Sequence, residues 1–184
     1  METSIGWLGR LADDPTDADW RRLNDLYVPL LRERLAQTGV GAADRDDLVQ
    51  EVLMAVVRRV GEFEHRGPGA FRAWLRGILA NHVRAYFRTR RESPAVDLDQ
   101  LAGDGTALSR LWDREHDEHV ALRAMRLVEG DFTPVTWQAF LRQVLDDCPP
   151  AEVAAELGVS LNAVIQAKSR VMKRLRAELR GLVE

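Results

Sequence analysis

The chain has 184 residues, of which 46% are hydrophobic, 30% charged and 7% aromatic, and its formal net charge is −3. This length accommodates one ordinary domain or two small ones, and the composition is typical of a globular protein. No apolar run approaches the roughly 20 residues that span a bilayer, so we expect no membrane insertion. The single cysteine, Cys148, excludes an intramolecular disulfide and fits a cytoplasmic protein.

Basic and acidic residues are segregated along the chain, so the small net charge hides local excesses of both signs. Basic residues are concentrated from Arg72 to Arg91 and again from Lys168 to Arg180. Acidic residues are concentrated at Asp44–Asp47 and from Asp97 to Glu118. A protein that is acidic overall can bind nucleic acid when its cations share one surface. Because the net charge of the whole protein is negative, however, we expect the free protein to bind non-specific DNA only weakly.

Apolar residues recur at helical spacing along most of the chain, and strand signals are scarce. The first long helix is predicted over Asp19–Gln37, and Gly39 follows its end. The next helix is predicted to begin near Asp44 or Asp46, either of which can cap it. It carries a wide apolar stripe from Leu48 to Val60.

A third helix is predicted from Ala70 to about Arg91, after the turn Gly67-Pro68-Gly69. From Glu92 to about Ala107 no helical period is sustained, which indicates a linker. Helical patterning resumes at Leu108. The predicted fold is therefore all-α, with two small helical domains joined by a flexible linker. The expected bounds are 1–92 for the first domain, 93–110 for the linker and 111–184 for the second domain.

The C-terminal region has the pattern of a helix-turn-helix. A short helix with small residues around Val153 and Ala154 is followed by Gly158, which permits a tight left-handed turn. Ser160 can then cap a second helix that runs from Leu161 to about Leu179. In such units the second helix enters the major groove and places its N-terminal residues on base edges.

The two faces of this second helix differ in chemistry. The side chains expected to face inward are Leu161, Val164, Val171, Leu175 and Leu179. The outward face presents amides and cations, which read base edges or hold phosphates. The predicted DNA-binding residues are Asn162, Gln166, Lys168, Ser169, Arg170, Lys173 and Arg174. A solvated basic face is the alternative, but the order of small-residue helix, glycine turn, cap and basic helix favours DNA.

Aromatic side chains are interleaved with arginines in the third predicted helix. Phe71 and Trp74 are expected to be core residues first, whereas the polar Asn81 is a candidate for base contact. Aromatic rings suit stacking on unpaired bases while guanidinium groups hold the backbone. The predicted DNA-binding residues here are Asn81, Arg84, Tyr86, Arg88, Arg90 and Arg91. A solvated arginine cluster that stabilises the helix dipole is the alternative.

The order of these motifs resembles a bacterial RNA polymerase sigma factor of the extracytoplasmic-function (ECF) type, from about Asp17 to Leu182. The resemblance implies that Asp46–Val60 is similar to region 2.2, which binds the clamp helices of the polymerase's largest subunit. The stretch from Phe71 to Asn81 is similar to region 2.3, which helps to open the promoter. Asn81–Arg91 is similar to region 2.4, which reads the minus-ten element. The residues that would bind the core polymerase by position are Asp47, Leu48, Gln50, Glu51 and Val52.

The helix-turn-helix is similar to region 4.2, which reads the minus-thirty-five element. The resemblance implies promoter recognition without enzymatic activity, catalytic residues, cofactor or metal, and with core RNA polymerase and promoter DNA as partners. An anti-sigma factor is the usual further partner in the family, although no residue here identifies one. Two alternatives are a sigma-like decoy that sequesters an anti-sigma factor and a helix-turn-helix regulator with an unrelated sensor domain. The decoy hypothesis predicts that the basic surfaces have lost their cations. The regulator hypothesis leaves the motif at residues 46–51 unexplained.

His116 and His119 lie three residues apart in an acidic stretch, which makes a metal site conceivable. No further His or Cys stands nearby to complete a tetrahedral set, so neither a metal site nor a metalloenzyme is predicted. The acidic stretch is expected to be a solvated surface or an electrostatic partner for one of the basic helices.

Overall fold

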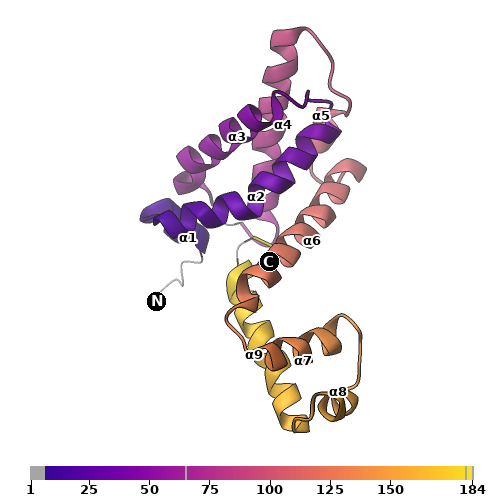
Figure 1. Ribbon diagram of the computed structural model, residues 1–184. Helices are drawn as coiled ribbons and strands as arrows, with labels where there is room; N and C mark the ends of the chain where they lie inside the picture. The colour runs from indigo at the N-terminus through magenta and orange to yellow at the C-terminus, as the bar shows by residue number, and fades with distance from the viewer. Residues whose placement is uncertain (1–6, 65, 181, 184) are drawn as a thin grey trace. The chain divides into compact units, whose positions relative to one another are not determined.

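The computed structural model describes residues 7–64, 66–180 and 182–183, and it confirms the all-α prediction. These described residues form α-helices and one short 3-10 helix, and none of them lies in a β-strand. The elements are α1 (Trp7–Asp13), α2 (Asp17–Gln37), α3 (Arg45–Arg59), η1 (Val60–Glu62), α4 (Ala70–Arg90), α5 (Leu98–Ala102), α6 (Ala107–Glu129), α7 (Pro134–Val144), α8 (Pro150–Leu157) and α9 (Leu161–Leu179) (Figure 1). No helix in the described part of the chain is long and apolar enough to cross a membrane.

The chain divides into two compact units, and the division falls within α6. The first unit comprises Met1–Ala121 and Arg180–Glu184, and the second comprises Leu122–Leu179. The division therefore lies further along the chain than the expected bounds, which separated residues 1–92 from 111–184. Both expected domains also include positions outside the described residues, namely 1–6, 65, 181 and 184.

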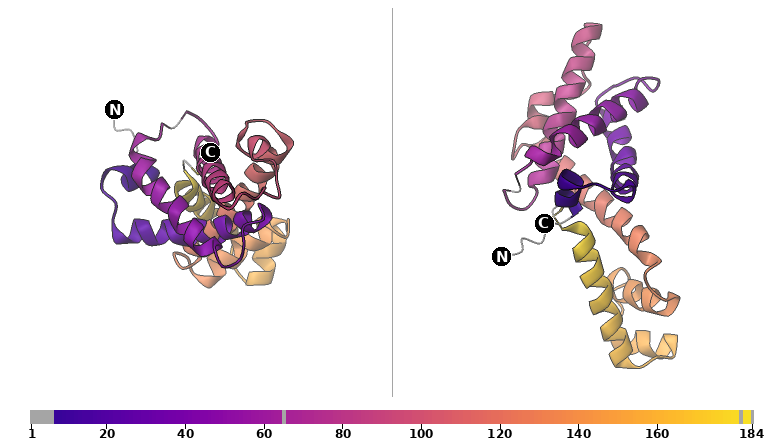
Figure 2. Two further views of the ribbon diagram at one scale, coloured as in Figure 1. Left: turned by 90° about the horizontal axis from the view of Figure 1, so that it is seen from above. Right: turned by 90° about the vertical axis from the view of Figure 1, so that its left-hand side faces the viewer.

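The first unit is built around α3, which packs against both α2 and α4 (Figure 2). α2 begins with a capping box, in which the side chains of Thr16 and Asp19 each accept a hydrogen bond from the other residue's backbone N–H. The side-chain hydrogen bond from Thr16 also lowers the pKa of Asp19. The apolar stripes predicted for these helices are largely buried, with Leu31, Val52 and Leu79 fully enclosed, although Val57 of α3 is exposed.

The segment expected as a linker, residues 93–110, contains α5 and the start of α6. Asp97 caps α5 by accepting hydrogen bonds from the backbone N–H groups of Gln100 and Asp99, and these bonds lower the pKa of Asp97. Both leucines of α5 are buried, and the helix packs against α4. The linker prediction was wrong about local structure because a five-residue helix is too short to show a period in the sequence.

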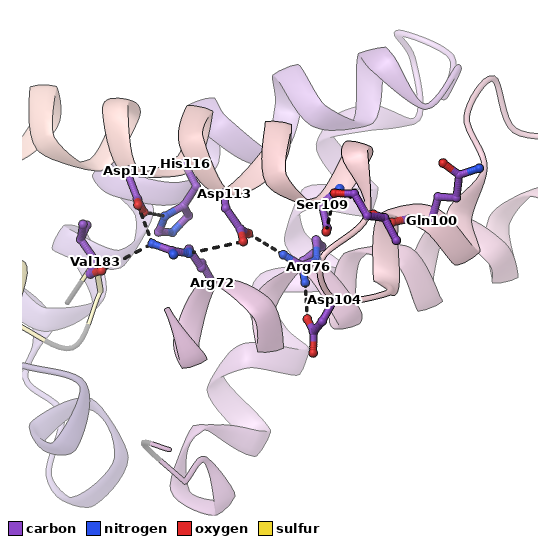
Figure 3. Close-up of polar contacts among 10 residues, drawn as sticks. Arg72, Arg76, Gln100, Asp104, Ser109, Asp113, His116, Asp117 and Val183 are labelled. Carbon is purple, nitrogen blue, oxygen red and sulfur yellow. Dashed lines mark hydrogen bonds and ion pairs between the residues drawn. The ribbon is translucent and has the colours of Figure 1, made fainter. Parts of the chain in front are cut away.

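Ion pairs between α4 and α6 connect the first half of α6 to the first unit (Figure 3). Arg76 is only 1% exposed, and it donates to Asp113 at 2.5 Å and to Asp104 at 2.6 Å. Arg72 donates to Asp117 at 2.5 Å and lies 3.7 Å from Asp113. The acidic stretch is therefore an electrostatic partner of a basic helix, which is one of the two outcomes expected from the sequence.

The two histidines of α6 contact residues of α2. Nε2 of the fully buried His116 lies 3.4 Å from the hydroxyl of Tyr27. Nε2 of His119 lies 2.8 Å from the carbonyl oxygen of Leu26, to which it donates. Burial raises the pKa of Tyr27, because the charged phenolate is poorly solvated there. Among the described residues, no group of three or more His, Cys, Asp and Glu side chains is placed to hold a metal ion.

The second unit is a small bundle of α7, α8 and α9, completed by the end of α6 (Figure 1). Trp137, Phe140 and Val171 are central to its larger apolar cluster. A smaller cluster lies where α8 meets α7 and α9. The buried Gln143 of α7 donates from Nε2 to two backbone carbonyls, one of them that of Val164 in α9. This amide satisfies its donors while it fixes α7 against α9.

We expect Asp113→Asn to destabilise the protein more than Asp104→Asn does. Asp113 pairs with a guanidinium that is almost wholly buried, so removing the carboxylate charge should cost about 2–3 kcal/mol. Asp104 is 88% exposed, and its loss should cost about 0–1 kcal/mol. Urea unfolding of the two full-length variants, followed by far-ultraviolet circular dichroism, measures both losses. Equal losses would contradict the role that the structure assigns to Asp113.

Candidate polymerase and nucleic-acid interfaces

The exposed side of the first half of α3 is acidic and carries the polar residues predicted to bind polymerase. Asp47, Gln50 and Glu51 are all exposed, and their spacing places them on neighbouring rows of one helix. Leu48 and Val52 are buried in the first unit. These two can support the exposed face from within, but they present no surface to a partner.

Two apolar residues of α3 are exposed that the sequence analysis did not assign to a site. Met54 is 51% exposed and lies one turn beyond Gln50. Val57, expected within the buried stripe, is also exposed and continues the same row. Exposed apolar groups beside polar ones are typical of the buried centre and polar rim of an interface. The sequence pattern could have indicated the exposure of Met54, which lies off the buried rows. It could not have done so for Val57, which also continues the row of the buried Val49 and Leu53.

In the middle of α4, Asn81 is exposed while Arg84 is held by other residues. Arg84 donates from Nη1 to Oδ1 of Asn81 at 2.9 Å and from Nη2 to Asp99 at 2.6 Å. Asp99 belongs to α5, so a carboxylate of the same unit competes with any phosphate for this guanidinium. Arg84 must leave or share Asp99 before it can bind DNA.

Asp44, Tyr86 and Arg90 form a cluster that the sequence analysis missed. The Tyr86 hydroxyl donates to one carboxylate oxygen of Asp44 at 2.8 Å, and Nη2 of Arg90 lies 3.0 Å from the other. The guanidinium of Arg90 also lies over the Tyr86 ring, with Cζ 3.9 Å from the ring centroid. Asp44 occupies the N-cap position of α3, as expected, but its side chain accepts no capping hydrogen bond; Asp46, the other candidate, lies inside the helix.

The end of α4 presents two arginines that remain available. Arg88 and Arg91 are exposed, and neither pairs with a carboxylate among the residues that the structure describes. Arg91 adopts a left-handed conformation with φ of 55°, which ends the helix. Of the arginines predicted to bind DNA in this helix, these two need no rearrangement to meet a phosphate.

A hollow between α3 and α4 brings the two predicted sites of the first unit together. Its charged and aromatic lining includes Asp44, Asp47, Glu51, His82, Tyr86 and Arg90. Nδ1 of His82 lies 3.6 Å from the carboxylate of Glu51 across this hollow. The residues assigned to polymerase binding on α3 therefore adjoin those assigned to DNA on α4.

The aromatic residues at the start of α4 divide between core and surface. Phe71 is buried, as expected. Trp74 is half-buried, with its ring centroid 5.2 Å from that of Phe63. Phe63 and Trp74 also line a second hollow together with the exposed Arg66.

In the second unit, α8 and α9 are joined by the predicted turn. Gly158 has a left-handed φ of 66°, a conformation that other residues adopt only with strain. The Ser160 hydroxyl accepts a hydrogen bond from the N–H of Ala163 at 3.2 Å and so caps the start of α9. Val159 is partly buried against the smaller apolar cluster.

The two faces of α9 are separated largely as predicted. Val164, Val171 and Leu175 are buried, and Leu179 packs partly against the larger apolar cluster. Leu161 is 48% exposed, so its inward assignment was wrong. It lies on the first turn of α9, where Val164 rather than Leu161 meets the smaller cluster.

The outward face of α9 carries a polar stripe. Asn162, Gln166, Ser169 and Lys173 follow one another at steps of four, three and four residues, and all are exposed. Lys168 and Arg170 are exposed on either side of this stripe. Most of the predicted DNA-binding residues of α9 are therefore accessible in this unit.

Arg174 differs from the other cations of α9 because two carboxylates hold it. It donates to Glu178 at 2.5 Å and to Asp131 at 2.8 Å, and the hydrogen bond to Glu178 raises its pKa. Arg170 and Lys173 line a shallow hollow beside Arg174 and the half-buried Phe132. A phosphate approaching this side would meet Arg170 and Lys173 first.

The segment that contains α3, α4 and most of α2 has a recognisable family. Residues 24–93 match sigma-70 region 2. This sigma-70 region 2 domain supports a role as a sigma factor in transcription initiation, with core RNA polymerase and promoter DNA as partners. The match includes every predicted site residue of α3 and α4, but it ends before α5 and covers neither α8 nor α9. No curated protein is significantly similar to the chain.

Proposed function

We propose that this protein is a minimal two-domain sigma factor of the ECF type, which acts in the cytoplasm and has no chemistry of its own. The domain predicted at 1–92 binds core polymerase and captures the opened minus-ten strand. The domain predicted at 111–184 binds the minus-thirty-five duplex. The observation that carries the proposal is the sigma-70 region 2 match, within which acidic residues of α3 and the basic α4 line a common hollow.

The polymerase contact is assigned to the exposed face of α3. Asp47, Gln50 and Glu51 supply polar contacts, and the exposed Met54 supplies apolar area among them. Such a combination fits an interface in which an apolar residue is covered and the polar groups around it select the partner.

The minus-ten contact is assigned to the second half of α4. Arg88 and Arg91 hold phosphates, and Asn81 is accessible to a base. Tyr86 and Arg90 together offer a ring and a guanidinium of the kind that accept unpaired bases. Capture of flipped bases offsets an unstacking cost of a few kcal/mol, so opening needs no nucleotide hydrolysis by this chain.

The minus-thirty-five contact is assigned to the polar stripe of α9. Asn162 and Gln166 are amides at the start of the helix, the part of a recognition helix that reaches base edges. The exposed cations Arg170 and Lys173 support contact with DNA rather than a decoy that only sequesters an anti-sigma factor. An anti-sigma factor remains a proposed regulator on the strength of the family resemblance.

Transcription from purified components tests the proposal. Core polymerase with the full chain should produce transcripts that start at defined positions on genomic DNA fragments, whereas core polymerase alone should not. The transcripts should disappear when the template lacks the upstream and minus-ten segments. If no template gives a defined start although the protein binds the core enzyme, the decoy alternative is favoured instead.

Replacing Gln50 and Glu51 together by Ala should weaken binding to core polymerase about tenfold, because interface energy is concentrated in a few contacts. Both side chains are exposed, so the fold should be unaffected. The matched control is Glu129→Ala with Gln138→Ala, which removes the same residue types from exposed positions in the second unit. Fluorescence titration of labelled protein with core enzyme measures both affinities. Unchanged affinity of the first variant would place the polymerase contact elsewhere.

Arg170→Ala should weaken binding of the holoenzyme to the upstream element by about 1–3 kcal/mol at one base pair, if its guanidinium pairs bidentately with guanine. Arg126→Ala, an exposed arginine on α6, is the control that removes the same charge away from α9. Competition between duplexes that differ at single upstream base pairs measures the change in specificity. A uniform loss across all duplexes would reassign Arg170 to a phosphate.

A further inference from the structure

Two large apolar side chains on α9 are exposed, although other positions of the same helix are buried. Leu161 is 48% exposed and Ile165 is 51% exposed. The core positions beside them are occupied by Val164 and Ala167, which are buried in the smaller apolar cluster. Residues four apart are neighbours on a helix surface, so Leu161 and Ile165 form one apolar patch. Packing within the second unit does not account for it.

The surroundings of this patch indicate an anionic occupant. Residues 161–177 contain five cations, Lys168, Arg170, Lys173, Arg174 and Arg176, and no acidic residue. Ile165 directly precedes Gln166 and lies one turn beyond Leu161, so the patch borders the polar stripe. An apolar patch beside amides on a cationic helix fits duplex DNA better than an apolar protein groove.

We propose that Ile165, with Leu161 beside it, contacts thymine methyl groups in the duplex that α9 reads. This inference rests on the proposed function and names the sequence class that the site selects. Thymine alone among the standard DNA bases presents a methyl group in the major groove, where apolar side chains contact it. Asn162 and Gln166 have the amide group that pairs with the N6 and N7 atoms of adenine. The face therefore selects A·T base pairs, with thymine methyls against Ile165.

Replacing thymine by deoxyuridine tests the contact because it removes the methyl group and leaves base pairing intact. The probe is a promoter duplex that the holoenzyme itself selects from genomic fragments, with each upstream thymine replaced in turn. Covering one methyl group is worth about a fourfold change in affinity. We expect a loss of that size at one or two thymines and none at the others, measured by fluorescence anisotropy at fixed salt.

Ile165→Ala should weaken binding to the thymine duplex and should also abolish the difference between thymine and deoxyuridine at the same position. This coupling identifies the contact, since each change then removes the same interaction. Ile165→Val, which retains a branched side chain, should preserve part of the difference. Leu122→Ala removes a similarly exposed apolar side chain from α6 and should leave the difference unchanged. Circular dichroism checks that every variant is folded.

Three results would overturn the inference while the proposed function stands. The first is a selected upstream element that contains no thymine, and the second is the finding that no deoxyuridine substitution changes binding. The third is an Ile165→Ala variant that loses the same affinity for thymine duplexes as for deoxyuridine duplexes. The last result would mean that Ile165 meets another group, such as a protein partner. A wild-type holoenzyme that binds no duplex at all would overturn both the inference and the proposed function.

Discussion

The near-complete burial of the Arg76 guanidinium constrains the architecture of the first unit. A charged group in such a position must be paired, because its desolvation costs several kcal/mol. Its partners, Asp104 and Asp113, come after α5 in the chain. The chain that leaves α4 must therefore return to it, and the returning segment brings α5 and the first half of α6 into the unit. The ion pair of the buried Arg34 with Glu115 adds a second connection of the same kind, between α2 and α6.

This arrangement divides the arginines of α4 into two groups. Carboxylates that follow in the sequence engage Arg72, Arg76 and Arg84. Asp44, which precedes α4, engages Arg90, whereas Arg88 and Arg91 at the end of the helix pair with no carboxylate among the described residues. Intramolecular pairing thus confines the available positive charge to the last turns of α4. A count of basic residues in the sequence overstates the surface available for the proposed DNA contact, because it cannot distinguish a cation paired with a carboxylate from an unpaired one.

The parts of the fold that could be predicted are those whose cause lies within one helix. The apolar periodicity of α2, α3 and α4 is visible in the sequence because each helix buries a continuous stripe of its own residues. The interactions that escaped prediction join residues distant in sequence. Asp44 meets Tyr86 and Arg90 across more than forty positions, and no local pattern marks it as their partner. The prediction of a linker around α5 was wrong for a related reason. This helix is stabilised by contacts with α4 rather than by an apolar periodicity of its own.

The same distinction explains why the bounds of α9 were predicted correctly while the inward orientation of its first residue, Leu161, was not. Periodicity assigns Leu161 to the inward face, but the three-residue turn after α8 brings Val164 to the apolar cluster and leaves Leu161 beyond it. An apolar side chain in that position gains little from folding, since it stays half in contact with water. The Leu161 side chain stays hydrated until a partner covers it. Its apolar area is therefore expected to contribute to binding rather than to folding. Because the other polar groups exposed on this helix are mainly amides and cations, the partner proposed to remove that water is a methyl-bearing base in the major groove.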